Sequence, residues 1–257
     1  MDLKDVYLEL CAGGILMRAL ELVKPSNYQR LDPVEFLYEC LTSEAARRQT
    51  KKVATRIKKS ACIYSDACIE NTLYAPDRKL NRGLIERLAC CDWIRHGEHC
   101  AITGATGSGK TWLASALMNA AIRAGFRAKY YRVNDLLLEY VESASNTTLR
   151  TSKKKQLNRY HLLMIDEFGL GSLTANQRAD LLEIINERTR EGGKSVIVTS
   201  VFPVDVWASC IGDVSSSDSI LDRLIYRAWR LNLEGPSMRS RTECGALEDP
   251  YGKKLKP

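Results

Sequence analysis

One segment constrains the fold of this chain more than any other, the run Gly-Ala-Thr-Gly-Ser-Gly-Lys-Thr at residues 104–111. It matches G-x-x-x-x-G-K-[ST], the phosphate-binding loop, at every fixed position. Glycines let the backbone curl so that successive N–H groups point inward, and a helix beginning near Lys110 directs its positive end to the same place. Because an apolar strand precedes the loop at 99–103, the sequence predicts a P-loop α/β fold.

The residue types of this loop indicate how ATP and Mg²⁺ would be held. Lys110 is placed to reach the β- and γ-phosphates, and the Thr111 hydroxyl is placed to bind Mg²⁺. We expect the rest of the loop and the start of the following helix to surround the phosphates. The predicted nucleotide-binding residues are Gly104, Ala105, Thr106, Gly107, Ser108, Gly109, Lys110, Thr111 and Trp112.

A second motif, Leu-Leu-Met-Ile-Asp-Glu at 162–167, combines a fully apolar strand with two acids at its end. In open α/β sheets, ligands bind beyond the C-terminal ends of the strands, so both acids should face the phosphates. We predict that Asp166 holds the magnesium shell and that Glu167 orients and polarises the attacking water. Together with Lys110, Glu167 is a predicted catalytic residue.

A later apolar strand, residues 196–200, ends in the hydroxyls of Thr199 and Ser200. In this kind of sheet it can lie between the first strand and the strand that carries the acids. Either Thr199 or Ser200 could then contact the γ-phosphate or the attacking water, with Ser200 the predicted catalytic residue. The alternative is a strand-end hydroxyl that only caps the next turn.

The pattern of the whole chain predicts two domains. Residues 1–75 are expected to form a helical N-terminal domain that binds a partner or DNA, with Asp32 and Pro33 opening one of its helices. Residues 76–257 are expected to form the ATPase domain, because short apolar strands alternate with helices there. Expected strands are 99–103, 128–133, 162–165, 195–199 and 230–233; expected helices are 110–124, 136–142, 175–191 and 220–228; 143–159 is expected to be a polar, basic loop.

Charge indicates a polyanionic partner. The net charge is +7, and two stretches concentrate it: 47–59, which has no acid, and 150–159. If subunits surround DNA, such residues would follow its phosphate backbone without reading sequence. For each stretch the alternative is an ordinary solvated surface. The predicted DNA-binding residues are Arg47, Arg48, Lys51, Lys52, Lys153, Lys154 and Lys155.

Composition argues against other classes of protein. No apolar run approaches the roughly 18 residues that a membrane span needs, and the first residues do not read as a signal peptide. The nine cysteines are scattered without Cys-x-x-Cys spacing, which is typical of reduced thiols in a cytoplasmic protein. A zinc site at Cys90, Cys91, His96, His99 and Cys100 is disfavoured, because adjacent residues diverge on a helix and alternate faces on a strand.

Several stretches together resemble the AAA+ ATPases of the IstB/DnaC group, and above all the IstB-like helper ATPases of insertion sequences. The stretches are 88–111, 111–117, 163–169, 220–224 and 233–239. The resemblance implies an AAA+ parallel sheet flanked by helices, preceded by a small helical N-terminal domain. It implies a homo-oligomer that assembles on double-stranded DNA, hydrolyses ATP between subunits and assists the transposase of the same element. In such an assembly Arg223 reaches the γ-phosphate of a neighbouring subunit; the alternative is local pairing with Asp222 or Glu183.

The sequence departs from this family at three places. Val201 stands where an amide usually follows the strand-end hydroxyls, so the γ-phosphate contact falls to Ser200 or Thr199. Gly235-Pro236-Ser237 replaces the usual Gly-Glu-Ser. Too few residues follow Leu233 for a C-terminal helical lid, so a lid arginine would have to be Arg239 or Arg241.

Other functions stay open from the sequence. A DnaC-like helicase loader would use the N-terminal helices on a helicase instead of a transposase. A P-loop kinase of a small metabolite would phosphorylate a substrate, although the Asp-Glu pair favours activation of water. A binding module would use ATP only as a structural clamp.

Overall fold

The structure, a computed structural model of the chain, describes residues 13–23, 32–143, 146–190 and 193–238. The contacts divide the chain into two compact units, Met1–Arg56 and Ile57–Pro257. The candidate lid arginines Arg239 and Arg241, and the first twelve residues of the expected helical domain, lie outside the described residues.

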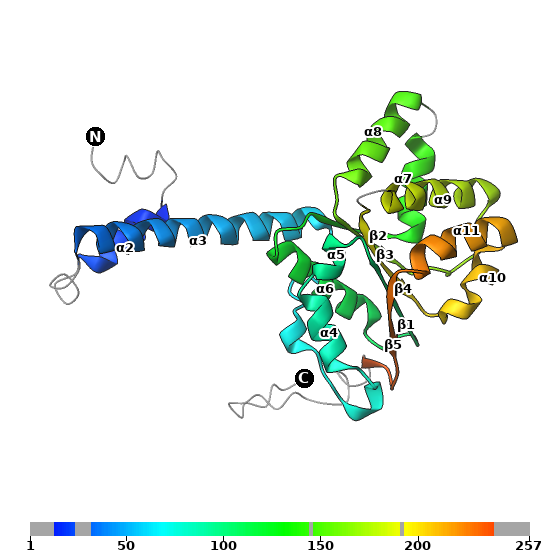
Figure 1. Cartoon of the computed structure of the whole chain (residues 1–257), viewed down its shortest axis with the longest axis horizontal. Helices are drawn as coiled ribbons and strands as arrows, with labels where there is room; N and C mark the ends of the chain where they lie inside the picture. Colours follow the sequence, from blue (N-terminus) through cyan, green and yellow to red (C-terminus); the bar gives the residue numbers. More distant parts are fainter. Residues whose placement is uncertain (1–12, 24–31, 144–145, 191–192, 239–257) are drawn as a thin grey trace, which may run out of the picture. The chain divides into compact units, whose positions relative to one another are not determined.

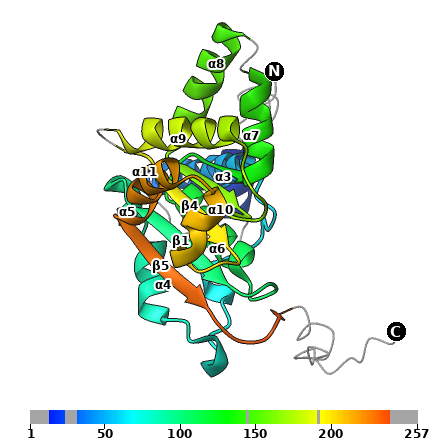
Figure 2. The same ribbon diagram turned by 90° about the vertical axis from the view of Figure 1, so that its right-hand side faces the viewer.

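A five-stranded parallel sheet with the order β2-β3-β4-β1-β5 forms the centre of the second unit (Figure 1). The predicted position of the strand that ends in Thr199 and Ser200, between the first strand and the strand that carries the acids, is confirmed. Every residue of β3 and β4 is buried, as expected for central strands of a parallel sheet. Figure 2 shows β5 at one edge of the sheet, next to β1. The strands are β1 (His99–Gly104), β2 (Ala128–Arg132), β3 (Leu162–Asp166), β4 (Ser195–Ser200) and β5 (Ala228–Leu233).

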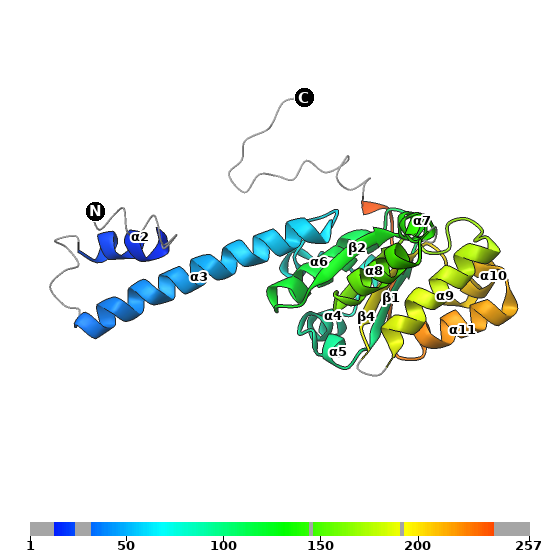
Figure 3. The same ribbon diagram turned by 90° about the horizontal axis from the view of Figure 1, so that it is seen from above.

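Helices cover both faces of this sheet (Figures 1 and 3). On one face α6 packs across four strands and contacts α4. On the other face α7, α9 and α11 bury apolar side chains against the sheet, and the rings of Phe168 and Trp207 contact each other at a tilt of 52°, with centroids 4.8 Å apart. The helices are α4 (Arg82–Ala89), α5 (Asp92–Arg95), α6 (Lys110–Arg123), α7 (Val133–Glu142), α8 (Thr147–Asn158), α9 (Ala175–Thr189), α10 (Trp207–Ile211) and α11 (Val214–Ile225).

The segment that follows α3 belongs to the second unit, although we expected residues up to 75 in the N-terminal domain. Its backbone is held by Asn119 on α6, whose fully buried side-chain amide donates to the carbonyls of Tyr64 and Ala67 at 2.9 and 3.0 Å. A 3-10 turn, η1 (Ile69–Asn71), also packs on α6. Because this segment covers the outer face of α6, that helix is buried on nearly all sides.

The prediction of a basic loop at 143–159 was wrong, because most of this segment is the helix α8. Asn146 caps its N-terminus: the side-chain oxygen accepts a hydrogen bond from the Thr148 N–H at 2.7 Å. The run Thr147–Asn158 contains no glycine or proline, and Leu157 anchors it in the core. A local cap and one buried leucine therefore outweighed the polar character of the segment.

The described part of the first unit is a pair of helices, α2 (Gly13–Leu22) and α3 (Pro33–Ser60), of which the last residues belong to the second unit. As predicted, Asp32 caps α3, accepting from the Val34 N–H at 3.2 Å. Glu44 of α3 accepts from the Gly14 N–H at 2.8 Å, and a Cβ on Gly14 would lie 2.8 Å from a Glu44 oxygen. Hydrogen bonds from Arg47 and Arg48 lower the pKa of Glu44 to about 2. Close approach of the helices at Gly14 thus fixes this carboxylate.

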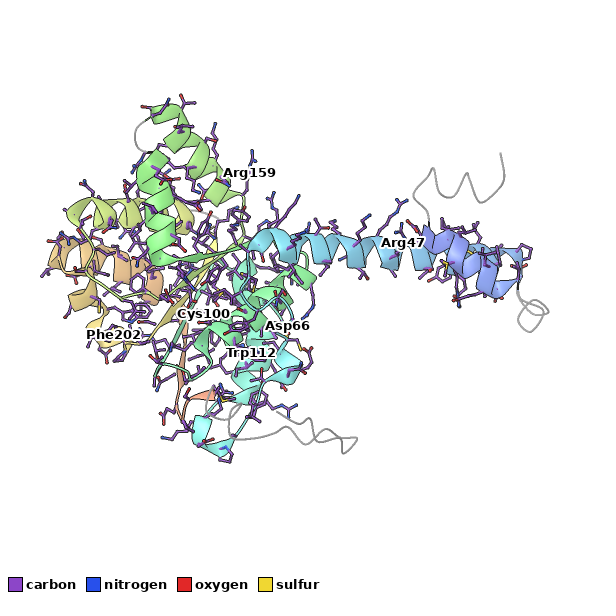
Figure 4. All side chains as sticks on the ribbon, turned by 180° about the vertical axis from the view of Figure 1, so that it is seen from behind. Arg47, Asp66, Cys100, Trp112, Arg159 and Phe202 are labelled. Atoms are coloured by element: carbon purple, nitrogen blue, oxygen red, sulfur yellow. The ribbon has the colours of Figure 1, made fainter. Side chains whose placement is uncertain are left out.

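The cysteines and the candidate zinc ligands are dispersed in the structure. Cys100 is fully buried inside the sheet (Figure 4), and the neighbouring His99 accepts a hydrogen bond from the Val196 N–H at 3.2 Å. Within the described ranges, no three His, Cys, Asp or Glu side chains are grouped so that they could hold a metal ion. None of the helices in that part of the chain is long and apolar enough to cross a membrane.

Candidate nucleotide-binding site

The phosphate loop joins β1 to α6 and has the backbone that its glycines permit. Gly104, Gly107 and Gly109 have φ angles of 144°, 81° and 91°, which disfavour residues with a side chain. A Cβ on Gly104 would lie 2.2 Å from the Leu233 carbonyl, and one on Gly107 2.1 Å from the Ser237 hydroxyl. The loop is therefore closely packed against the end of β5 and the segment that follows it.

Within this loop the polar atoms face a site for an anion. Lys110 is 9% exposed, and its ammonium group donates to the Ala105 carbonyl at 2.8 Å. Burial lowers the pKa of Lys110, while the nearby Asp166 opposes that shift. The Ser108 hydroxyl oxygen is buried without a hydrogen-bond partner. A bound phosphate would supply partners to both groups, so the loop fits the predicted ligand.

Asp166 ends β3 and is held by hydroxyl groups from three directions. Thr111 and Thr199 both donate to its Oδ1 atom, Thr111 at 3.2 Å. Tyr130 on β2 donates to Oδ2 at 3.1 Å, and burial together with Asp166 raises the pKa of this tyrosine. Mg²⁺ prefers oxygen ligands such as carboxylates and hydroxyls, so Thr111 and Asp166 fit the predicted metal. Tyr130, which the sequence did not indicate, is therefore a residue of the site.

Glu167 follows β3 in a left-handed conformation, with φ of 61°. This conformation is uncommon for a residue with a side chain and is often found at functional sites. It directs the Glu167 carboxylate toward Arg132, whose Nε lies 3.6 Å away, and both side chains are about half exposed. Arg132 ends β2 and pairs in register with Asp166, which explains its proximity. The acid that we assigned to the attacking water is thus accessible and beside a guanidinium.

The two strand-end hydroxyls of β4 have different partners. Thr199 donates to Asp166, and its own hydroxyl oxygen lies 3.4 Å from the Glu167 amide. Both residues are 1% exposed, and Ser200 donates to the Phe168 carbonyl at 2.6 Å and accepts from the Phe202 N–H at 3.1 Å. Ser200 therefore holds the following turn, whereas Thr199 contacts the carboxylate of Asp166.

A pocket of about 330 Å³ adjoins the phosphate loop and contains residues that sequence reasoning missed. The predicted residues Gly107, Gly109, Lys110, Thr111 and Trp112 line it, and Figure 4 marks Trp112 on α6. Its other side comes from segments before β1 and after β5. The missed lining residues are Tyr64, Asn71, Leu73, Arg78 and Met238.

Two of these missed residues attach distant segments to the loop. Arg78 is 4% exposed and donates to the Ser108 carbonyl at 2.9 Å and the Leu73 carbonyl at 2.7 Å. The Met238 N–H donates to the Gly107 carbonyl at 2.8 Å. No local pattern in the sequence indicated these contacts, since the segment before β1 has only the composition of a linker.

Arg223 lies away from these residues, on the last turn of α11. It is exposed, and its guanidinium donates to the Ser219 carbonyl of the same helix at 2.7 Å. Among the described residues it makes no ion pair with Asp222 or Glu183, the local partners that we had considered.

The predicted DNA-binding residues fall into two classes. Carboxylates of the same unit pair with Lys153 and Lys154 on α8, through Glu139 and Glu183. Glu44 pairs with Arg47 and Arg48 on α3. The remaining three, Lys51, Lys52 and Lys155, are exposed and form no ion pair within the described ranges.

Comparison with known proteins agrees with this site. The family model of IstB-like ATP-binding proteins matches residues 9–246. An insertion-sequence ATP-binding protein of Sinorhizobium fredii, y4uH, is 38% identical over 235 residues, which cover 91% of this chain and 93% of that protein. The ATP-binding protein of insertion sequence IS1162 from Pseudomonas fluorescens is 38% identical over 197 residues, covering 76% of this chain and 83% of that protein.

Solved structures show the same fold at low sequence identity. The DnaC helicase loader superposes with a TM-score of 0.56 and 19% identity, covering 66% of this chain and 98% of that one. AMPPCP-bound DnaA from Aquifex aeolicus gives a TM-score of 0.58 and 19% identity, covering 74% of this chain and 57% of the longer DnaA chain. The fold is that of AAA+ P-loop proteins, and the chain belongs to the family of IstB-like ATP-binding proteins.

Proposed function

We propose that this chain is a Mg²⁺-dependent ATPase that assembles on double-stranded DNA and assists the transposase of the same insertion sequence. The observation that carries the proposal is the convergence of Lys110, Thr111, Asp166 and Glu167 at the C-terminal ends of β1 and β3. These groups supply the phosphate cradle, the metal ligands and a carboxylate for water. The names of the relatives, which refer to insertion sequences, support the biological setting.

The residues of one chain would divide the work as follows. Backbone N–H groups of the loop and the ammonium of Lys110 bind the phosphates. Mg²⁺, when bound, neutralises charge on the β- and γ-phosphates. Asp166 orients the metal shell because hydroxyls fix both of its oxygens. Glu167 orients a water for in-line attack once its carboxylate leaves Arg132. Tyr64 and Leu73, exposed at the adjoining pocket, offer apolar surface for the base.

A second chain would complete the site. Arg223 makes no ion pair among the described residues, and it lies at the end of α11, away from the phosphate loop of its own chain. An arginine supplied by a neighbouring subunit neutralises charge that develops during phosphoryl transfer, an effect of about 10³- to 10⁵-fold on the rate. Hydrolysis would therefore depend on assembly, and ATP on Arg223 would favour the assembled state.

DNA would be held by exposed basic residues rather than by all the lysines that the sequence suggested. Lys51, Lys52 and Lys155 carry no ion pair within the described ranges, whereas Lys153 and Lys154 are paired with carboxylates. Binding of phosphates by such residues releases counterions and weakens steeply as salt rises. A helicase-loader role would use the same ATPase chemistry with a different protein partner. Binding of the purified chain to the transposase encoded beside its gene, and not to a helicase, is the result expected here.

The variant Glu167→Gln tests the proposal. It keeps the size of the side chain and removes the charge that would polarise water, so ATP and DNA binding should persist while turnover falls at least a hundredfold, on the order expected for loss of a general base. Glu70→Gln, an exposed acid of η1, is the matched control and should hydrolyse ATP normally. Unchanged hydrolysis by Glu167→Gln would reject the assigned role.

Electron microscopy tests whether the chain assembles on DNA in an ATP-dependent way. The chain should form ordered oligomers on duplex DNA with ATP, and these should be absent with ADP. Identical particles with either nucleotide would contradict the proposed dependence. A phosphorylated metabolite in place of free phosphate would indicate a small-molecule kinase instead.

A further inference from the structure

A second pocket lies at the N-terminal ends of the strands, at the end of the sheet opposite to the nucleotide site. It has a volume of about 550 Å³ and forms where β1 and β5 begin, at His99 and Ala228. The phosphate loop and the acids instead follow the C-terminal ends of the parallel strands. Four arginines line the pocket, Arg95, Arg190, Arg223 and Arg227, with Asp222 as the single carboxylate of the lining.

Two of these four arginines form ion pairs with carboxylates of the described residues. Arg95 pairs with Asp92 at 2.9 Å, and Arg190 pairs with Glu187 at 3.2 Å. Arg223 and Arg227 form no ion pair in the part of the chain that the structure describes. Like charges gathered in one concavity repel each other unless an anion neutralises them. The lining is thus suited to a phosphate group.

The backbone of Arg227 is held firmly at this pocket. Its carbonyl accepts a hydrogen bond from the His99 N–H at 3.0 Å, and the next residue begins the pairing of β5 with β1. Arg188, which like Arg227 acts on the charge of His99, is 1% exposed and donates to backbone carbonyls, among them those of Leu157 and Ser195. This buried guanidinium forms no ion pair with any described residue and adds positive potential near His99, a residue of the lining.

We propose that Arg227 is a second arginine which, together with Arg223, binds the phosphates of ATP held by the next copy of this chain. The proposal rests on the function proposed above and adds a residue to the site between subunits. A concave lining in which two arginines face one space suits a compact phosphate group better than an extended strand. The P-loop site of one chain supplies Lys110 as its cation, so two guanidinium forks from a neighbour would contact non-bridging oxygens that the lysine leaves.

The variant Arg227→Ala tests this role, with Arg230→Ala as the matched control. Both side chains are exposed and lie three residues apart, but Arg230 is not in the lining of the pocket. Arg227→Ala should bind ATP within about twofold of the wild type and hydrolyse it at least tenfold more slowly in the presence of duplex DNA. Arg227→Lys should recover only part of the rate, because an ammonium lacks the guanidinium fork. The control should hydrolyse ATP normally.

Mixing variants distinguishes a role in the neighbouring subunit from a role within the chain. Glu167→Gln subunits retain both arginines but lack the proposed general base, and Arg227→Ala subunits have the reverse defect. Mixed before ATP is added, they should hydrolyse more ATP than the sum of the two alone, because some interfaces combine an intact Glu167 with an intact Arg227.

Each outcome bears on a separate claim. If Arg223→Ala slows hydrolysis and Arg227→Ala does not, the inference fails and the proposed function stands. No recovery in the mixture would overturn action between subunits. Loss of DNA binding by Arg227→Ala, with hydrolysis in the absence of DNA unchanged, would overturn the inference in favour of a DNA-backbone contact. If Glu167→Gln hydrolyses ATP at the wild-type rate, the proposed function fails, and the inference fails with it.

Discussion

In the central sheet, the C-terminal and the N-terminal ends of the strands differ in how their charged groups are paired. At the C-terminal ends of the strands, Asp166 accepts from three hydroxyls and Lys110 donates to a carbonyl of its own loop. At the N-terminal ends of the strands, Arg223 and Arg227 line one pocket and form no ion pair within the described ranges. At the C-terminal ends of the strands, groups of a single chain are arranged for a ligand, whereas the pocket at the N-terminal ends contains two arginines that form no ion pair with any described residue.

Under the proposed function, this contrast would let one chain bind a nucleotide while a second chain completes the site for hydrolysis. Positioning of a triphosphate and its metal depends on groups that must be fixed before the ligand arrives. Negative charge that develops in the transition state can be neutralised by arginines that a neighbouring subunit supplies on assembly. Variants at the two ends of the strands should therefore separate ATP binding from ATP hydrolysis.

The largest expected effect is on binding itself. Lys110→Ala removes the cation of the loop and should weaken ATP binding by roughly a hundredfold, as expected for loss of charge-assisted hydrogen bonds worth a few kcal/mol. Arg123→Ala, at the exposed far end of the same helix, is the control and should bind ATP normally. Titration with a fluorescent ATP analogue measures both. Equal affinity of the two variants would show that the loop does not hold the phosphates.

The next effect concerns the two hydroxyls at the end of β4. Thr199→Val keeps the shape and removes the donor to Asp166, so Mg²⁺-dependent turnover should fall about tenfold or more. Ser200→Ala should instead lower the free energy of unfolding by about 1–2 kcal/mol, because it leaves the Phe168 carbonyl and the Phe202 N–H without their partner. Turnover assays with thermal unfolding compare them. A larger turnover defect in Ser200→Ala would return the role to Ser200.

A smaller effect is expected at Tyr130. Tyr130→Phe removes the hydroxyl that donates to Oδ2 of Asp166 and preserves the buried ring. The Mg²⁺ concentration for half-maximal turnover should rise several-fold, on the order of a lost hydrogen bond to a charged group, with ATP binding in EDTA unchanged. Competition by Mn²⁺, followed by electron paramagnetic resonance, gives a readout of metal affinity without turnover. An unaltered metal requirement would make Tyr130 a packing residue only.

The last effect is a pH dependence of stability at the N-terminal ends of the strands. Burial, with added repulsion from Arg188 and Arg227, lowers the pKa of His99 to about 4. The unfolded chain binds a proton at His99 below pH about 6.5 and the folded chain does not, so stability is complete above that pH and falls between pH 6.5 and 4. The slope from this residue is about 1 kcal/mol per pH unit. Chemical unfolding of wild type and His99→Gln from pH 7 to 5 should show a flatter profile in the variant.

Several local features were predictable from sequence because neighbouring residues encode them. The glycines and Lys110 of the loop act through backbone conformation, and the four apolar residues before Asp166 require a buried strand. The N-cap of α3 at Asp32 is equally local. The helix α8 was missed because its polar composition resembled a loop, while its cap at Asn146 depends on a single side chain. Local sequence signals thus predicted the phosphate loop and the strand that carries Asp166 more reliably than they predicted the connecting segments.

By itself, the sequence determined the fold class, the family, the phosphate loop and the pair Asp166 and Glu167. The tertiary structure alone decided that Thr199 and Tyr130 hold Asp166, that Arg132 lies beside Glu167, and that a segment before β1 borders the nucleotide pocket. The physical reason is the range of the interactions. A phosphate loop is specified by the conformations of consecutive residues, whereas a hydrogen bond between strands depends on the packing that brings distant residues within about 3 Å.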